Sequence, residues 1–163
     1  MPHPMKKFFP IVVVAFAALF LNSCLEGDYQ STPRISVYAL YRTNPSGVKD
    51  TLRFGDTIQV GDTVLAPMLL EGMYNELVYF KVSADTSLFD YILVRDTTNA
   101  HLLASDSKPE EGYLHFVSGC YLYPAMLRYV AKKSGTYPIH VELGSTANEK
   151  YSPAKGYFNQ TVK

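Results

Sequence analysis

The sequence predicts an all-β domain, with an antiparallel β-sandwich of about seven to nine strands as the preferred arrangement and a small β-barrel as the second. Short segments in which apolar and polar residues alternate recur along most of the chain. Clusters of Gly, Pro, Asn and Asp separate these segments at intervals of about 8–12 residues, which is the cadence of strands and turns. Beyond residue 33, no stretch has the period of a long amphipathic helix.

A hairpin is predicted within residues 35–54. Apolar and polar residues alternate from Ile35 to Arg42, and turn-forming residues follow at 44–47. Residues 48–54 then form the returning strand. The apolar face expected for the first strand comprises Ile35, Val37, Ala39 and Tyr41.

The triplet Gly-Asp-Thr occurs at residues 55–57 and again at 61–63, which indicates strand, turn and strand in succession rather than a repeat architecture. Gly61-Asp62 is the predicted turn, and a strand is expected over 63–70. A stronger strand is predicted over 77–84, with its apolar face made by Val78, Phe80, Val82 and Ala84.

The second half of the chain predicts shorter strands around one polar loop. Strands are expected at 91–94 and 113–117, and the polar segment 104–112 between them is expected to be the most mobile. Residues 121–131 alternate as in a strand, although Ala-Met-Leu-Arg would also suit a helical turn. Strands at 136–143 and 157–162, joined by a polar loop, close the domain.

Two of these segments resemble immunoglobulin-like modules. "VGDTV" opening a strand, followed by a Phe- and Val-rich strand, is similar to the early strands of bacterial immunoglobulin-like domains. "GTYPIHVEL", a loop and then "YFNQTVK" resemble the final hairpin of such domains. The resemblance implies an immunoglobulin-like sandwich over residues 34–163.

The N-terminus resembles a bacterial lipoprotein signal peptide. Lys6 and Lys7 precede an apolar run from Phe8 to Leu21, which is shorter than the ~20 apolar residues of a membrane-spanning helix. Leu21, Asn22, Ser23 and Cys24 then match a lipobox, in which the cysteine thiol receives the lipid. We therefore expect a signal peptide over 1–23, a lipidated Cys24 and a flexible tether over 24–33; an uncleaved anchor and plain secretion are the alternatives.

The residues behind Cys24 bear on the membrane to which the protein is attached. Leu25 is not the aspartate associated with inner-membrane retention, so the resemblance implies the outer membrane. Glu26 and Asp28 are similar to the acidic export signals of Bacteroidota-type lipoproteins. These residues favour the cell surface over the periplasmic face, and they make the membrane the first expected partner, contacted through the N-terminal lipid.

Composition argues against several classes of function. The chain has 15 basic and 15 acidic residues, and loss of Lys6 and Lys7 with the signal leaves a slightly acidic domain, so nucleic acid is not an expected partner. With Cys24 acylated, Cys120 has no cysteine to pair with and is expected to be a small buried residue. His101, His115 and His140 lack metal-site spacing, and no nucleophile elbow or calcium loop is present. We therefore expect no catalytic residues, no metal and no cofactor.

Two groups of residues are the candidate sites in the mature domain. The first is a set of tyrosines that could form an exposed platform for a protein or a glycan, although packing within the sheets is the preferred interpretation. Its members are Tyr113, Tyr121, Tyr123 and Tyr129. The second is a set of threonines behind aspartate, similar to the O-glycosylation sequon of Bacteroidota, although Asp-Thr turns explain the same pattern. Its members are Thr51, Thr57, Thr63 and Thr97.

The sequence therefore predicts a lipid-anchored, non-catalytic binding or structural module of the cell envelope. An envelope protein is one expected partner. A glycan-binding accessory lipoprotein is the alternative, motivated by the tyrosines, and a small enzyme or inhibitor built on the sandwich is the weakest hypothesis.

Overall fold

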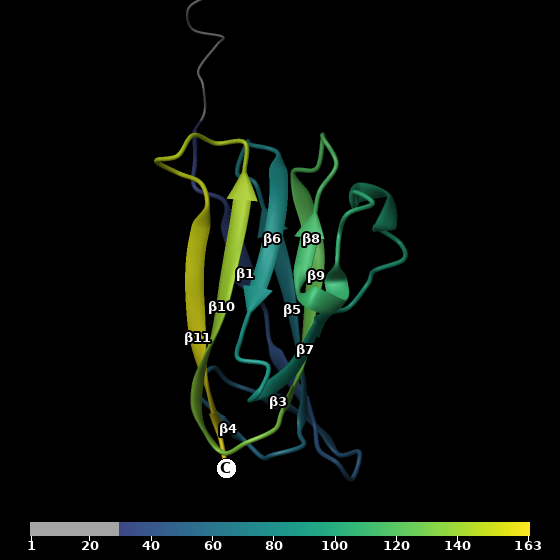
Figure 1. The fold of residues 1–163 in the computed structure, drawn as a ribbon, viewed down its shortest axis with the longest axis vertical. Coiled ribbons are helices and arrows are strands. Elements are labelled where there is room, and N and C mark those ends of the chain that lie inside the picture. Colours follow the sequence, from purple (N-terminus) through teal and green to yellow (C-terminus); the bar gives the residue numbers. More distant parts are fainter. Residues whose placement is uncertain (1–29) are drawn as a thin grey trace, which may run out of the picture.

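The structure, a computed structural model, describes residues 30–163 as two β-sheets packed face to face (Figure 1). The predicted signal peptide, the predicted lipobox and Cys24 lie outside the described residues. Within residues 30–163, no helix is long and apolar enough to cross a membrane.

Eleven strands and two short 3-10 helices follow one another along the described chain. Their order is β1 (Arg34–Val37), β2 (Leu40–Thr43), β3 (Lys49–Leu52), β4 (Thr57–Ile58), β5 (Thr63–Glu71), β6 (Leu77–Ser83), β7 (Phe89–Leu93), η2 (Ala100–Leu102), η3 (Pro109–Glu111), β8 (Tyr113–His115), β9 (Leu122–Ala131), β10 (Gly135–Ser145) and β11 (Ala154–Val162).

The strands form a six-stranded and a five-stranded sheet. The first has the order β3-β2-β5-β9-β7, with β1 also paired to β5, and the second has the order β4-β11-β10-β6-β8. The strands β1, β5, β9 and β7 occupy the places of A, B, E and D in an immunoglobulin sandwich, and β6, β10 and β11 those of C, F and G. The predicted immunoglobulin-like sandwich is therefore confirmed, and the small barrel is not formed.

The described chain contains more strands than predicted because the first predicted strand is split and because β4 is a separate short strand. Val37 pairs with Met68 and Tyr41 pairs with Leu65, so the chain carries one extra residue opposite Pro67. Proline has no N–H for the ladder, and a bulge is where a strand tolerates it. The extra residue reverses the side-chain phase. Leu40 is consequently 3% exposed and Tyr41 48% exposed, so the predicted inward position of Tyr41 is wrong.

The two Gly-Asp-Thr triplets form the same turn twice. Gly55 and Gly61 have φ angles of 91° and 89°, which only glycine adopts readily. Asp56 Oδ2 accepts a hydrogen bond from Arg53 N, and Asp62 Oδ2 accepts one from Gln59 N, both at 2.8 Å. The predicted strand–turn–strand pattern is confirmed, with β4 lying between the two turns.

The core lies between the sheets and is built from alternate residues of the long strands. Every second residue of β9, beginning with Tyr123, is buried, and the same holds in β5 from Val64 to Leu70. The ring of Phe89 meets those of Tyr129 and Tyr137 edge to face, at 5.7 and 5.9 Å. Each fully buried large apolar side chain contributes about 1.5–3 kcal/mol to folding, so this core is the main source of stability.

Candidate binding surfaces

The four predicted tyrosines do not form one exposed platform. Strand β9 alternates with a period of two, so Tyr123 and Tyr129 point into the core and are 2% and 0% exposed. Tyr121 precedes β9 and is 50% exposed. Tyr113 lies on β8, which belongs to the other sheet. The platform is therefore a wrong prediction for Tyr123 and Tyr129, whereas sheet packing is confirmed for these two.

A polar and aromatic surface covers the outer face of the five-stranded sheet. The rings of Tyr79 and Tyr113 are stacked with centroids 6.3 Å apart, and the Tyr79 hydroxyl donates to Glu142. A Cβ on Gly144 would lie 2.3 Å from Tyr79 Cε1, so the glycine provides the space in which this ring lies. Burial and the Glu142 carboxylate raise the pKa of Tyr79 to about 12, and the hydrogen bond from Tyr79 lowers the pKa of Glu142.

The same face continues across β10 and β11. His140 and Tyr157 lie opposite each other with ring centroids 5.9 Å apart. Lys155 Nζ lies 3.5 Å from Glu142 Oε2. Tyr157 is 67% exposed. Rings flanked by hydrogen-bonding groups can stack on a sugar or contact a protein, and we call this surface the tyrosine face.

The outer face of the six-stranded sheet is apolar instead. A groove with a volume of ≈ 390 Å³ crosses β5 and β9 between Tyr38 and Val94. The outward-pointing residues that form its floor are apolar. An antiparallel sheet that faces water usually carries polar residues at such positions. We call it the apolar groove. Its outward-facing apolar lining is Tyr38, Pro67, Leu69, Val94, Pro124 and Met126, and Asp96 adds one carboxylate.

Further apolar side chains and paired charges surround the apolar groove. Leu122 is 51% exposed at the start of β9. Arg34 Nη2 lies 2.6 Å from Glu71 Oε2 at one end of the sheet, and Arg42 pairs with Asp50 at the other. Asp96 also lines the groove, and Arg128 is exposed on β9 beside it, so the groove is an apolar strip bordered by charged groups.

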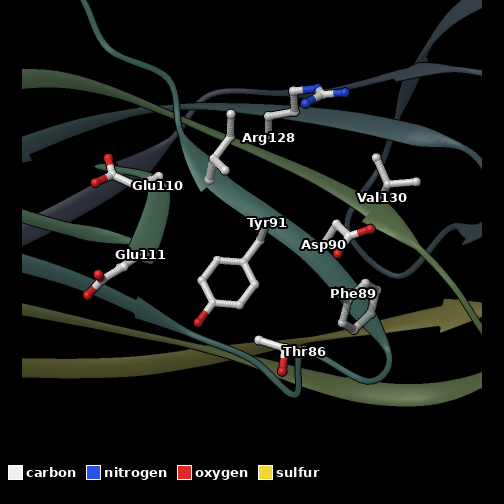
Figure 2. Close-up of a pocket in the computed structure, with 9 residues that line it drawn as sticks. Thr86, Phe89, Asp90, Tyr91, Glu110, Glu111, Arg128 and Val130 are labelled. Atoms are coloured by element: carbon white, nitrogen blue, oxygen red, sulfur yellow. The ribbon is translucent and has the colours of Figure 1, made fainter. Parts of the chain in front are cut away.

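A further hollow, of ≈ 630 Å³, lies beside the edge strand β7. Figure 2 shows Glu110 and Glu111 on one side of Tyr91 and Asp90 on the other. Lys132 Nζ lies 2.5 Å from Asp90 Oδ1, so one carboxylate here is already paired. The short helix η3 lies against β7. It covers part of the free edge, which protects the sheet from pairing with another strand.

Cys120 is a structural residue. Its side chain is 1% exposed, and burial raises the pKa of its thiol, which disfavours the reactive thiolate. Its predicted burial is confirmed.

The three histidines of the mature domain lie in separate places. His115 Nδ1 is 2.7 Å from Asp106 Oδ1, and His140 belongs to the tyrosine face. Across residues 30–163, no three His, Cys, Asp or Glu side chains are grouped so that they could hold a metal ion.

The four candidate threonines differ in accessibility. Thr51 on β3 and Thr97 in the loop after β7 are exposed, whereas Thr57 and Thr63 are half-buried within β4 and β5. The aspartates before Thr57 and Thr63 accept turn hydrogen bonds, so turn formation explains two of the four triplets. Any modification of the folded domain would reach Thr51 and Thr97 most easily.

Residues 30–33, which the sequence assigns to the tether, are packed against the domain. Gln30 Oε1 accepts a hydrogen bond of 2.6 Å from Asn148 N, and Ser31 Oγ donates to Met73 O. Pro33 is buried. These contacts place the start of the described chain at the end of the sandwich that carries the β5–β6 and β10–β11 loops.

Sequence reasoning missed the apolar groove, although a signal was present. Residues 64–70 form an uninterrupted apolar run. Such a run predicts a strand that is apolar on both faces, one toward the core and one outward. The alternation from Ile35 to Val37 already places Tyr38 outward, whereas the bulge opposite Pro67 changes the side on which Tyr41 lies.

Comparisons with known proteins give little beyond the fold. No protein-family model matches the chain, and no curated protein matches it. Among solved structures, it is similar to the C-terminal domain of the Streptococcus pyogenes antigen I/II-family protein AspA, with 16% identity and a TM-score of 0.45. The match covers 80% of this chain and 46% of that one, so the chain spans less than half the length of its structural neighbour.

Proposed function

We propose that the protein is a non-catalytic binding module of the bacterial cell envelope, held at the outer membrane by a lipid on Cys24. In this proposal the signal peptide over 1–23 is removed, and the immunoglobulin-like domain binds a protein partner through the apolar groove. The lipobox Leu21-Asn22-Ser23-Cys24 supports the anchor, and the apolar groove supports the binding role.

The apolar groove is the single observation that carries the binding role. Tyr38 is 69%, Val94 39% and Met126 36% exposed, and all three line one depression on one sheet. A contiguous apolar surface of this kind is unfavourable in water, and covering it releases about 25 cal/mol per Å². A partner that presents a matching apolar surface would therefore be bound there, with Tyr38 as an aromatic anchor.

Site-specific crosslinking in the native bacterium tests this proposal. The photoreactive residue p-benzoylphenylalanine replaces Tyr38 in one variant of the protein and Tyr157 in a second variant. The two residues are matched controls, since they are 69% and 67% exposed on opposite faces. We expect the probe at Tyr38 to crosslink one discrete envelope protein, and the probe at Tyr157 to leave that protein uncrosslinked.

A second substitution in the Tyr38 probe chain makes the test specific. Met126→Lys places a charge in the apolar groove and should abolish the crosslinked band. A band that survives Met126→Lys, or that appears equally with the probe at Tyr157, would show that the groove is not the binding surface. A band at twice the mass of the chain would identify the partner as a second copy.

Glycan binding through the tyrosine face is the second candidate function. The observation that favours it is the row of rings Tyr79, Tyr113 and Tyr157 beside Glu142 and Lys155. On a glycan array the intact domain would then bind a defined sugar, Tyr157→Ser would lose that binding, and Tyr38→Ser would keep it. An array without any bound sugar would remove this candidate.

A further inference from the structure

The end of the sandwich where the described chain begins carries a group of exposed aromatic and apolar side chains. Gln30 is hydrogen-bonded to the β10–β11 loop there, and Ser31 to the β5–β6 turn. Gly72 N donates to Tyr121 O at 2.9 Å, which places the β5–β6 turn beside the segment before β9. Tyr74, Tyr121 and Leu122 at this end are 77%, 50% and 51% exposed.

The C-terminus lies at the opposite end of the sandwich, beside β4 (Figure 1). Val60 N donates to Lys163 O at 3.0 Å, and Val60 is 47% exposed at that end. Strand β10, with 11 residues at roughly 3.3 Å each, sets the distance between the two ends at about 36 Å. The molecule is therefore elongated, and its two ends differ in what they expose.

The β5–β6 turn presents Tyr74 outward at a conformational cost. Met73 and Tyr74 have φ angles of 49° and 81°, in the left-handed region that bulky residues rarely adopt. Such a conformation costs on the order of 1–3 kcal/mol and persists only where neighbouring groups hold it. Here Asn75, which is 7% exposed, donates from its side chain to Met73 O at 3.3 Å.

Glu76 and Lys150, two charged residues near these side chains, have contacts within the protein, and Glu149 in the β10–β11 loop is exposed. Glu76 accepts hydrogen bonds from Ser118 Oγ at 3.0 Å and from the Tyr121 hydroxyl at 3.3 Å. Lys150 lies 5.3 Å from the centroid of the Tyr151 ring. The end therefore presents rings with polar tips, held by local hydrogen bonds, rather than a field of one charge sign.

The chain between the anchor and this end is short. Only residues 25–29 stand between Cys24 and Gln30, and so few residues span at most about 20 Å in any conformation. A lipid on Cys24 would therefore hold this end of the sandwich close to the bilayer surface. The opposite end lies farther away by most of the length of the domain.

We propose that this end is a membrane-contact surface, with Tyr74 and Tyr121 placed at the lipid–water interface beside the anchor. Tyrosine is favoured at that interface because its ring is apolar and its hydroxyl is wet. This inference rests on the lipid anchor of the proposed function. Because this end of the sandwich faces the bilayer, both sheets stand away from the lipid, and the apolar groove stays open to a partner.

Fluorescence quenching by brominated lipid tests the orientation. The chain contains no tryptophan, so Tyr74→Trp introduces a single reporter at the membrane-contact surface, and Val60→Trp introduces a matched reporter at the opposite end. Each lipidated full chain is reconstituted in phosphatidylethanolamine vesicles with and without dibrominated phosphatidylcholine. We expect Tyr74→Trp to be quenched at least about twofold more than Val60→Trp, because only the interface lies within reach of the bromine atoms.

Flotation of the same vesicles separates failure of the anchor from failure of the orientation. Chains that float with lipid, while Tyr74→Trp and a second reporter, Tyr121→Trp, are quenched no more than Val60→Trp, would overturn the membrane-contact surface and leave the anchor in place. Chains that do not float at all would overturn the anchor and this inference with it. The inference is supported if Tyr74→Trp or Tyr121→Trp is quenched well above Val60→Trp.

Discussion

At the scale of single residues, the core contains a buried tyrosine hydroxyl with a hydrogen-bond partner. Tyr129 is 0% exposed, and its hydroxyl donates to Gln160 Oε1 at 2.7 Å. Gln160 in turn donates from Nε2 to Asp56 O and Thr161 O, both at 3.0 Å. This network connects β9 of one sheet to β11 of the other, and each buried polar group in it has a partner.

Removal of the Tyr129 hydroxyl should therefore lower the stability of the domain. We expect Tyr129→Phe to lower the free energy of unfolding by about 1–3 kcal/mol, because Gln160 Oε1 would stay buried without its donor. Tyr157→Phe removes the same atom from an exposed ring and should change stability little. Urea denaturation of both variants makes the comparison, and an equal effect of the two substitutions would contradict this account.

At the scale of elements, two devices shape the faces of the sandwich. The extra residue opposite Pro67 splits the first strand and turns Tyr41 outward, so that Tyr41 and Tyr38 are both exposed. Gly144 on β10 leaves room for the ring of Tyr79, which then reaches Glu142. The bulge adds exposed aromatic surface to the six-stranded sheet, and Gly144 makes room for the tyrosine face.

A side chain at Gly144 should damage the tyrosine face. Gly144→Ala would place Cβ 2.3 Å from Tyr79 Cε1, which forces the ring to move and breaks its hydrogen bond to Glu142. We expect a loss of about 1–3 kcal/mol in the free energy of unfolding, the typical cost of overpacking. Thermal unfolding measures it.

Gly156→Ala on the neighbouring strand is the matched control for this prediction. Its Cβ would lie 3.6 Å from Val141 Cγ2, an ordinary contact, so little change is expected. If Gly144→Ala were as stable as Gly156→Ala, the role given to Gly144 would be wrong.

At the scale of the whole molecule, two faces and one end have different chemistry. The six-stranded sheet exposes an apolar groove, the five-stranded sheet a polar aromatic face, and the start of the described chain a rim of exposed tyrosines. In the proposed arrangement the lipid on Cys24 orients all three, because the short tether leaves the domain little freedom to turn over.

Attachment should depend on Cys24 alone. In fractionated cells, we expect Cys24→Ser to move the protein from the membrane fraction to the soluble fraction, since no acyl chain would be attached. Cys120→Ser changes the other cysteine, which is buried in the core, and should leave the protein in the membrane fraction. Retention of Cys24→Ser in membranes would argue against lipidation as the anchor.

Much of the fold was predictable because it depends on local patterns. The alternation in 121–131 and 136–143 marks strands that the structure places at β9 and β10, and the repeated Gly-Asp-Thr marks two identical turns. The candidate sites were predicted poorly. Tyr121 and Tyr123 are two residues apart and would share a face in one continuous strand. Tyr121 is nevertheless half exposed and Tyr123 buried, because β9 begins only at Leu122.

The sequence by itself determined the fold class and most strand positions, and it carries the motif on which the predicted lipobox rests, since periodicity, turn chemistry and a signal motif are local properties of the chain. Only the tertiary structure decided which tyrosines are exposed, where the apolar groove lies, and that Tyr74 and Tyr121 share one end with the start of the domain. These features arise from pairing between distant strands, such as β5 with β9. A single bulge, or a shift of one residue in the pairing of two strands, moves a side chain from the core to the surface.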